Sequence, residues 1–188
     1  MAAPLNNNIR EKILEGTARL LENASFSSIT LGQIAREAGI SKGTLYYYYS
    51  NKDDILFEIA DRYLSALSDS LLEWTENPHK DTSLGRLLNY AFTRGIFDKS
   101  GNLRLYLLGE AVSGGGEELR EKLLAKYLYF KNTLAEKIRQ RKPGADADYA
   151  AWLVLTVMDG LLVQSRLQNA GLDMEGFLQK TVELMKNL

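Results

Sequence analysis

The chain has 188 residues, of which 45% are hydrophobic and 25% charged, and this ordinary globular composition argues against an intrinsically disordered protein. The absence of cysteine excludes disulfides, thiolate nucleophiles and cysteine-based zinc sites. A net charge of −1 at pH 7 excludes a protein that coats nucleic acid by bulk charge, but it allows a small, localised basic surface.

Neither a catalytic group nor a membrane segment is predicted. No apolar run approaches the roughly 20 residues that span a bilayer, and residues 1–8 lack the pattern of a signal peptide, so we expect a cytoplasmic protein. The only histidine, His79, lies in a turn-like segment, where a solvated side chain is far more common than a catalyst. We therefore expect a protein that is not an enzyme, with no catalytic residues, no metal site and no cofactor.

The first part of the chain predicts three helices with clear boundary signals. Periodic apolar residues indicate a helix over residues 8–24. Thr30 and Gln33 form a capping box that opens a second, short helix, and Gly39 ends it because glycine accepts a left-handed backbone. Ser41 is placed to cap a third helix, which runs from Lys42 to about Tyr48 or Tyr49.

The rest of the chain also predicts helices, and no segment alternates as a strand does. A long fourth helix begins after Ser50 or Asn51 and ends near residue 78. Five more are expected over residues 82–97, 102–112, 117–142, 146–170 and 173–188, the last capped by Asp173. The glycines at 114–116 indicate a loop or hinge, because they lack the spacing, lysine and hydroxyl residue of a phosphate-binding loop.

The second and third helices carry the functional signal. Two short helices joined by a turn that contains glycine are typical of a helix-turn-helix, whose second helix enters the major groove of DNA. Lys42 can donate to guanine or phosphate, Gly43 allows close backbone approach, and Thr44 offers a hydroxyl and a methyl group. At the start of the fourth helix, Lys52 places a cation beside backbone amides, a combination that favours a phosphate.

Four consecutive tyrosines follow, from Tyr46 to Tyr49, and they point in every direction around a helix axis. At least two must therefore face outward, where their hydroxyls can bind phosphates and fix the register on the duplex. We assign Tyr49 to the core and leave Tyr48 open.

At these residues the chain resembles the TetR family of bacterial regulators. The segment TLGQIAREAGISKGTLYYYYSNKDDI, residues 30–55, is similar to that family's DNA-binding signature, and the resemblance covers about residues 9–60. The family usually has Phe where Tyr49 stands and often His or Tyr where Tyr48 stands. The resemblance implies an all-α fold of about nine helices: an N-terminal helix-turn-helix domain, residues 1–52, and a ligand-binding and dimerisation domain, residues 53–188. It also implies DNA contacts from Thr30, Ser41, Lys42, Gly43, Thr44, Tyr46, Tyr47, Tyr48 and Lys52.

The last two helices are the predicted homodimer interface. The segment from 152 to 167 is apolar on more than one face, so that one side can pack on its own core and another on a partner. Gly160 would allow close approach of two helices. Completion of the monomer core is the alternative reading of these helices. The residues assigned to the interface are Leu153, Val157, Leu161, Gln164, Leu167, Leu178, Val182 and Met185.

The middle helices are rich in aromatic residues, which typically line ligand cavities together with a few polar groups. For any single residue, core packing or solvent exposure is the commoner role. Taken together, however, these helices predict a binding site for an unidentified small-molecule effector. The residues assigned to it are Tyr90, Phe92, Tyr106, Glu110, Tyr127, Trp152, Thr156 and Asp159.

These features together predict a dimeric transcription regulator that binds a palindromic DNA operator, senses a small molecule, and does not associate with membranes. A ligand-released repressor is the preferred interpretation, because the family mostly represses. A transcriptional activator of the same fold, or a helical ligand-binding protein with a vestigial DNA motif, remains the alternative.

Overall fold

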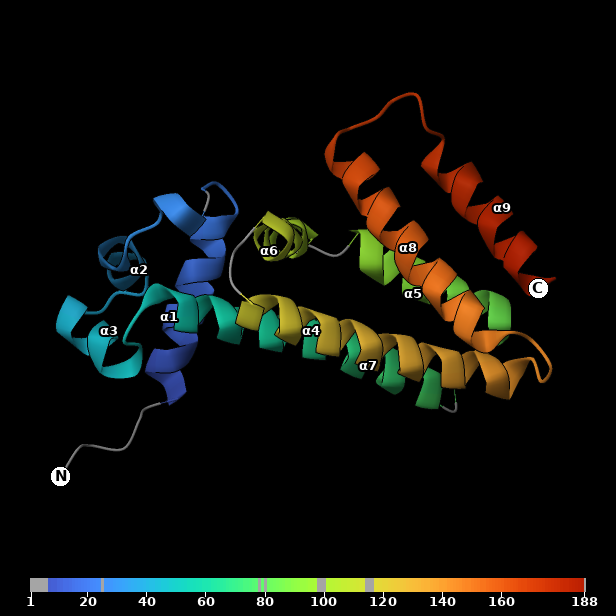
Figure 1. Ribbon diagram of the computed structural model, residues 1–188, viewed down its shortest axis with the longest axis horizontal. Coiled ribbons are helices and arrows are strands. Elements are labelled where there is room, and N and C mark those ends of the chain that lie inside the picture. The colour runs from blue at the N-terminus through green and yellow to red at the C-terminus, as the bar shows by residue number, and fades with distance from the viewer. Residues whose placement is uncertain are drawn as a thin grey trace. The chain divides into compact units, whose positions relative to one another are not determined.

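The computed structural model describes residues 7–24, 26–77, 79, 81–97, 101–113 and 117–187. Within them the protein is all-α, as predicted, with no strand (Figure 1). The expected glycine hinge at 114–116 lies outside the described residues. The helices are α1 (Asn7–Leu21), α2 (Leu31–Glu37), α3 (Lys42–Tyr48), α4 (Lys52–Glu76), α5 (Leu84–Phe97), α6 (Gly101–Ser113), α7 (Glu117–Arg141), α8 (Ala147–Arg166) and α9 (Met174–Lys186), with a short 3-10 turn, η1 (Phe26–Ser28).

The predicted helix boundaries are close to the observed ones, with one clear difference. α8 ends at Arg166 and not at residue 170, because Gln168 adopts a left-handed backbone with φ 51°. Glutamine is an unusual residue for that conformation, so the sequence carries no stop signal there. The predicted cap of α9 is confirmed, since the Asp173 side chain accepts a hydrogen bond from the backbone of Gly176.

The helices form two compact units that are discontinuous in sequence. The first comprises residues 1–62 and 102–122, and the second comprises residues 63–101 and 123–188. This grouping differs from the division predicted at residue 52, because α6 and the beginning of α7 pack with the N-terminal helices.

In the first unit, α2 packs against both α1 and α3. The fully buried side chains Ile13, Ile34 and Leu45 contribute one core residue from each helix. α1 and α2 approach closely at Gly16, where an added Cβ would lie 3.2 Å from the backbone nitrogen of Ala38. This packing orients the two short helices that carry the predicted DNA contacts.

In the second unit, α5 packs against α8 and α9, and the core continues onto α7 and the C-terminal part of α4 (Figure 1). α5 and α8 meet at Gly95, where an added Cβ would lie 1.6 Å from the sulfur of Met158. Met158 is itself buried. None of the helices described is both long enough and apolar enough to cross a membrane.

Candidate DNA-binding surface

The turn between α2 and α3 has the geometry that the sequence predicts. Thr30 caps α2 in a complete capping box: its side chain accepts from the Gln33 backbone, and the Gln33 side chain accepts from the Thr30 backbone. Gly39 has φ 67°, which suits glycine and ends the helix. The backbone N–H of Ile40 then donates to the carbonyl of Ala35 at 2.9 Å, which closes the end of α2.

The beginning of α3 presents small and polar groups to solvent. Ser41 caps the helix by accepting from the Thr44 backbone at 3.0 Å, and the two hydroxyls lie 2.8 Å apart. Lys42 and Gly43 are exposed. Among the described residues, a Cβ added at Gly43 would have the Ser41 hydroxyl as its nearest side-chain neighbour, at 3.8 Å. The backbone at Gly43 is therefore open to close approach by another molecule.

The tyrosines of α3 and its C-cap divide between the surface and the core. Tyr46 and Tyr47 are 56% and 49% exposed, whereas Tyr49 is buried. The expectations that at least two face outward and that Tyr49 joins the core are confirmed. Tyr48 is half-buried, and its ring lies edge-on to Tyr47 with centroids 5.4 Å apart. The exposed rings therefore extend along α3 from the groups at its N-terminus.

A carboxylate in α4 that is not predicted from the sequence connects α4 with α1 and with the C-cap of α3. Glu58 accepts from the Tyr49 hydroxyl at 2.7 Å and from Arg10 of α1 at 2.7 Å. It also binds Arg62, one turn later on α4, at 2.9 Å. Only the four-residue spacing of Glu58 and Arg62 is visible in the sequence. The other partners lie 9 and 48 residues away, so local pattern gives no signal for them.

The network sets the protonation of its members. Burial acts to raise the pKa of Glu58, but hydrogen bonds from Tyr49 and Arg10 outweigh it and lower the pKa below the usual range. Burial and the bond to Glu58 raise the pKa of the Tyr49 phenol, which therefore stays protonated and donates. At neutral pH the network is a carboxylate surrounded by three donors.

Glu58 should make the protein more stable at neutral pH than in acid. Because its folded pKa is lowered, its contribution is present above the unfolded value of about 4.3 and is lost as the pH falls through the folded pKa. We expect Glu58→Gln to lower the free energy of unfolding by about 1 kcal/mol at pH 7. Urea denaturation at a series of pH values should show this difference shrink below pH 4. A difference that stays constant into acid would contradict the assignment.

The position of Lys52 differs from the one expected of a phosphate ligand. Its ammonium donates to the backbone carbonyls of Phe26, Ser27 and Ile29 at 2.7, 3.2 and 3.1 Å. It also lies 4.7 Å from the centroid of the Phe26 ring. An ammonium has three N–H donors, and three carbonyls take them all.

The residues predicted to hold an effector differ in burial and in their neighbours. Phe92 is buried in the core of the second unit, Trp152 and Thr156 are exposed on α8, and Tyr90 stacks on Trp74 at 4.6 Å. The three cavities described are lined by other residues.

Two of these residues, Tyr127 and Asp159, form a hydrogen-bonded pair. Tyr127 donates to the carboxylate of Asp159 at 3.1 Å in the second unit. In the first unit, burial, and then a bond to Glu110, raises the pKa of Tyr106. The ring of Tyr106 lies 6.1 Å from that of Phe26.

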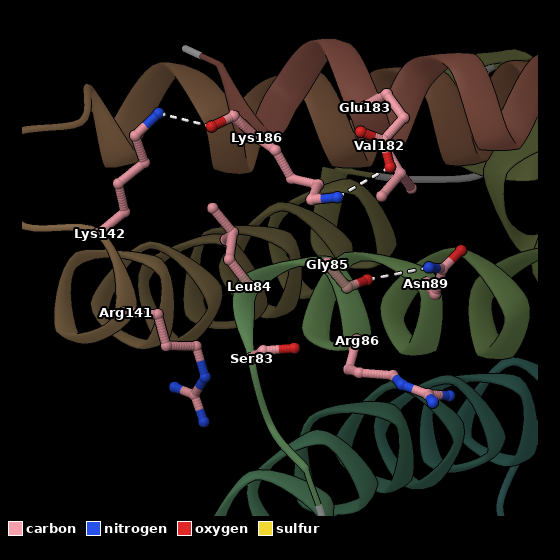
Figure 2. A pocket seen from close by; sticks show the side chains of 10 residues that line it. All are labelled: Ser83, Leu84, Gly85, Arg86, Asn89, Arg141, Lys142, Val182, Glu183 and Lys186. Carbon is pink, nitrogen blue, oxygen red and sulfur yellow. Dashed lines mark hydrogen bonds and ion pairs between the residues drawn. The ribbon is translucent and has the colours of Figure 1, made fainter.

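One of these cavities, about 490 Å³ in volume, lies among α5, α7 and α9 and is rich in cations (Figure 2). The cationic groups do not converge there. Lys142 donates to the backbone carbonyl of Lys186, and Lys186 pairs with Glu183 at 2.8 Å. Arg141 points away from both lysines and donates to backbone carbonyls, including that of Lys137. These groups close helix ends and do not form a shared site for an anion.

The predicted dimer residues are also divided by the structure. Leu161, Val182 and Met185 are buried in the core of their own protomer, so their assignment to the interface was wrong. They lie on the sides of α8 and α9 that face the core, and the apolar pattern alone could not separate the two faces. Leu153, Val157, Gln164 and Leu178 are half-buried, and Leu167 is 68% exposed.

α8 and α9 nevertheless carry an exposed apolar face. Its members recur at helical spacing, so that they share one side of each helix. We call them the α8–α9 face: Trp152 and Val163 on α8, Leu167 at its C-cap, and Phe177 and Leu184 on α9. Trp152 is predicted from the sequence as a ligand residue, and Val163, Phe177 and Leu184 are not among the predicted interface residues. Gly160 lies on the same side of α8 and is exposed, with nothing within 4 Å of an added Cβ.

Comparison with known proteins agrees with this geometry. Residues 13–59 match the profile of the bacterial regulatory proteins of the tetR family. The nucleoid occlusion factor SlmA of Shewanella denitrificans is 28% identical over 170 residues, which are 87% of this chain and 86% of that protein. The transcriptional regulator BetI 1 of Chromohalobacter salexigens is 23% identical over 172 residues, 88% of this chain and 83% of that protein.

The fold is also that of solved regulators. A proposed transcriptional regulator of Saccharomonospora viridis, crystallised in complex with choline, superposes with a TM-score of 0.81 at 21% identity. The match covers 96% of this chain and 97% of that one.

Proposed function

Because the chain belongs to the TetR family of DNA-binding transcriptional regulators, we propose that it is a repressor that binds a palindromic operator as a dimer and is released by a small molecule. The observation that carries this proposal is the exposed beginning of α3. A lysine, an open glycine backbone and two exposed tyrosines lie there on a helix that packs against α2. We assign this protein to the cytoplasm, where its DNA target would lie.

Each exposed group has a role that its chemistry suits. Lys42 and Thr44 reach base edges or phosphates from the first turn of α3, as the recognition helix of this motif does. Gly43 lets the helix backbone approach the floor of the groove. Tyr46 and Tyr47 donate hydroxyls to phosphates and set the register. Thr30, at the exposed N-terminus of α2, adds a phosphate contact.

The proposal is tested by selecting duplexes from a random pool with the purified protein at a stated salt concentration. We expect enrichment of a palindrome, because a two-fold dimer reads two related half-sites. The double variant Lys42→Ala with Tyr47→Ala should lose the enrichment while it keeps its helical content. Absence of any enriched sequence from the folded wild-type protein would contradict the proposal.

The α8–α9 face supports dimerisation. Exposed large apolar side chains gathered on one face mark protein interfaces, and Trp152 is the type of residue that dominates binding energy. Gly160 would permit a close crossing of α8 with its copy.

The double charge variant Trp152→Lys with Val163→Lys should therefore convert the dimer to a monomer. Two buried, unpaired lysines at an interface cost several kcal/mol, so we expect the dissociation constant to rise at least about 100-fold. Sedimentation equilibrium measures it. Leu124→Lys is the matched control, because Leu124 is 55% exposed on α7, outside the α8–α9 face, and should leave the dimer intact. A dimer that persists in the double variant would contradict the assignment of the α8–α9 face to the dimer interface.

Release by a small molecule is the remaining part of the proposal. The Saccharomonospora viridis relative was solved with choline, so the same fold holds a small molecule in that protein. The contact between Tyr106 of α6 and Phe26 of η1 could couple ligand binding to DNA binding, because a shift of α6 would displace η1, which lies just before α2 in the chain. An effector acts only as far as it binds the released state more tightly than the DNA-bound state.

Titration of the protein–operator complex with a metabolite library that includes choline tests this release. A fall in DNA affinity with at least one compound supports it. Unchanged affinity across a library in which a compound demonstrably binds the protein would contradict it.

A further inference from the structure

We propose that Lys52 is a positioning residue that holds η1 and the N-terminus of α2 in their DNA-binding arrangement, and that it is not a phosphate ligand. The inference rests on where its ammonium lies. It donates to three carbonyls of the segment from Phe26 to Ile29, at 2.7 to 3.2 Å. All three donors are used, so a phosphate could bind only by displacing one of these bonds.

The segment that Lys52 holds leads directly into the DNA-binding surface. The Phe26 carbonyl accepts from Lys52 and also from the backbone of Ile29, at 3.2 Å. Ile29 is buried, and the next residue, Thr30, is the N-cap of α2. The direction in which α2 starts therefore depends on the carbonyls that Lys52 fixes.

The contact is reinforced from a second side. The Phe26 ring is buried, and it lies 4.7 Å from the Lys52 ammonium and 6.1 Å from the ring of Tyr106. A cation over an aromatic face is attracted to it, and more strongly where water is excluded. Phe26 thus contacts α4 through its carbonyl and its ring, and its ring also contacts Tyr106 of α6.

Three variants separate a positioning role from a phosphate contact. Lys52→Met keeps the aliphatic stem and removes the ammonium. Lys52→Arg keeps the charge, but its planar fork cannot direct three N–H groups from one nitrogen at three carbonyls. Lys42→Met is the matched control, because it removes an exposed cation from the beginning of α3.

The first measurement is hydrogen exchange in the protein without DNA. We expect Lys52→Met and Lys52→Arg to speed exchange of the Ile29 amide and the first turn of α2 by about tenfold or more, since that segment then opens more easily. Lys42→Met should leave those rates unchanged. Wild-type rates in both Lys52 variants would overturn the proposal. Should Lys52→Met lose its helical circular dichroism, Lys52→Arg decides alone.

The second measurement is the salt dependence of binding to the duplex that the wild-type protein selects. Removing one phosphate-binding cation reduces the slope of log affinity against log salt by about 0.9. We expect both Lys52 variants to bind about tenfold more weakly with the wild-type slope, and Lys42→Met to reduce the slope. A reduced slope in Lys52→Met, or full affinity in Lys52→Arg, would overturn the proposal. If the wild-type protein binds no duplex, the proposed function fails while the exchange result still decides the role of Lys52.

Discussion

Replacing Gly43 by leucine should abolish sequence-specific DNA binding while leaving the fold intact. Among the described residues, a Cβ added at this position would approach only the Ser41 hydroxyl, at 3.8 Å, so we expect a larger side chain to project into the space where the groove of DNA lies. Leucine also favours a helix more than glycine does, by up to about 1 kcal/mol. We therefore expect the protein to be equally or more stable, with an affinity for the selected duplex that falls about a thousandfold, to the level of non-specific binding.

Fluorescence anisotropy with the selected and a scrambled duplex measures both affinities, and thermal unfolding measures the fold. Gly109→Leu is the control, because Gly109 is likewise helical and exposed, with nothing near an added Cβ. It should gain stability and bind the operator normally. Wild-type operator affinity in Gly43→Leu would show that α3 does not approach DNA through its first turn.

Gly95→Ala should destabilise the protein, although alanine is the better helix former. The added methyl group would lie 1.6 Å from the sulfur of Met158 and 2.4 Å from its Cγ. Met158 is buried in the core, where side chains are closely packed and a shift of one must displace others. Overpacking costs about 1–3 kcal/mol, more than the roughly 1 kcal/mol gained in helix propensity. We expect a net loss of about 1–2 kcal/mol in the free energy of unfolding.

A double-mutant cycle tests whether the clash is the cause. Met158→Ala alone leaves a cavity and should cost about 2–4 kcal/mol. In that background Gly95→Ala should become stabilising, because the methyl group then fills vacated space. A coupling of about 2 kcal/mol between the two positions is expected from urea denaturation. Additive effects would place the origin of the instability elsewhere.

The DNA-binding helices could be predicted from sequence because their signals are local. The capping box at Thr30, the left-handed backbone at Gly39 and the cap at Ser41 each depend on residues within four positions of one another, and each is confirmed. The division of the tyrosines follows from helical periodicity, which is also a local property. The end of α8 shows the limit of such reasoning, since Gln168 gives no stop signal.

The C-terminal assignments were less successful because they depend on which face of a helix meets which neighbour. On α8, Leu161 and Val163 are both apolar, yet one is buried and the other is 40% exposed. Composition cannot distinguish them, since the difference arises only once α5 has packed against α8. Tyr127 and Asp159 were assigned to the effector independently, and their contact across 32 residues depends on tertiary packing.

The Glu58 network limits how the recognition helix can be exchanged in an engineered regulator. Residues 41–48 supply the exposed groups, but the buried anchor of that segment is Tyr49, whose hydroxyl donates to Glu58. A segment transplanted from a relative with Phe at this position would keep the ring and lose the donor. The carboxylate would then rely on Arg10 and Arg62 alone. An exchange that ends at residue 48, or a longer one in which position 49 is kept as tyrosine, retains the hydrogen bond to Glu58.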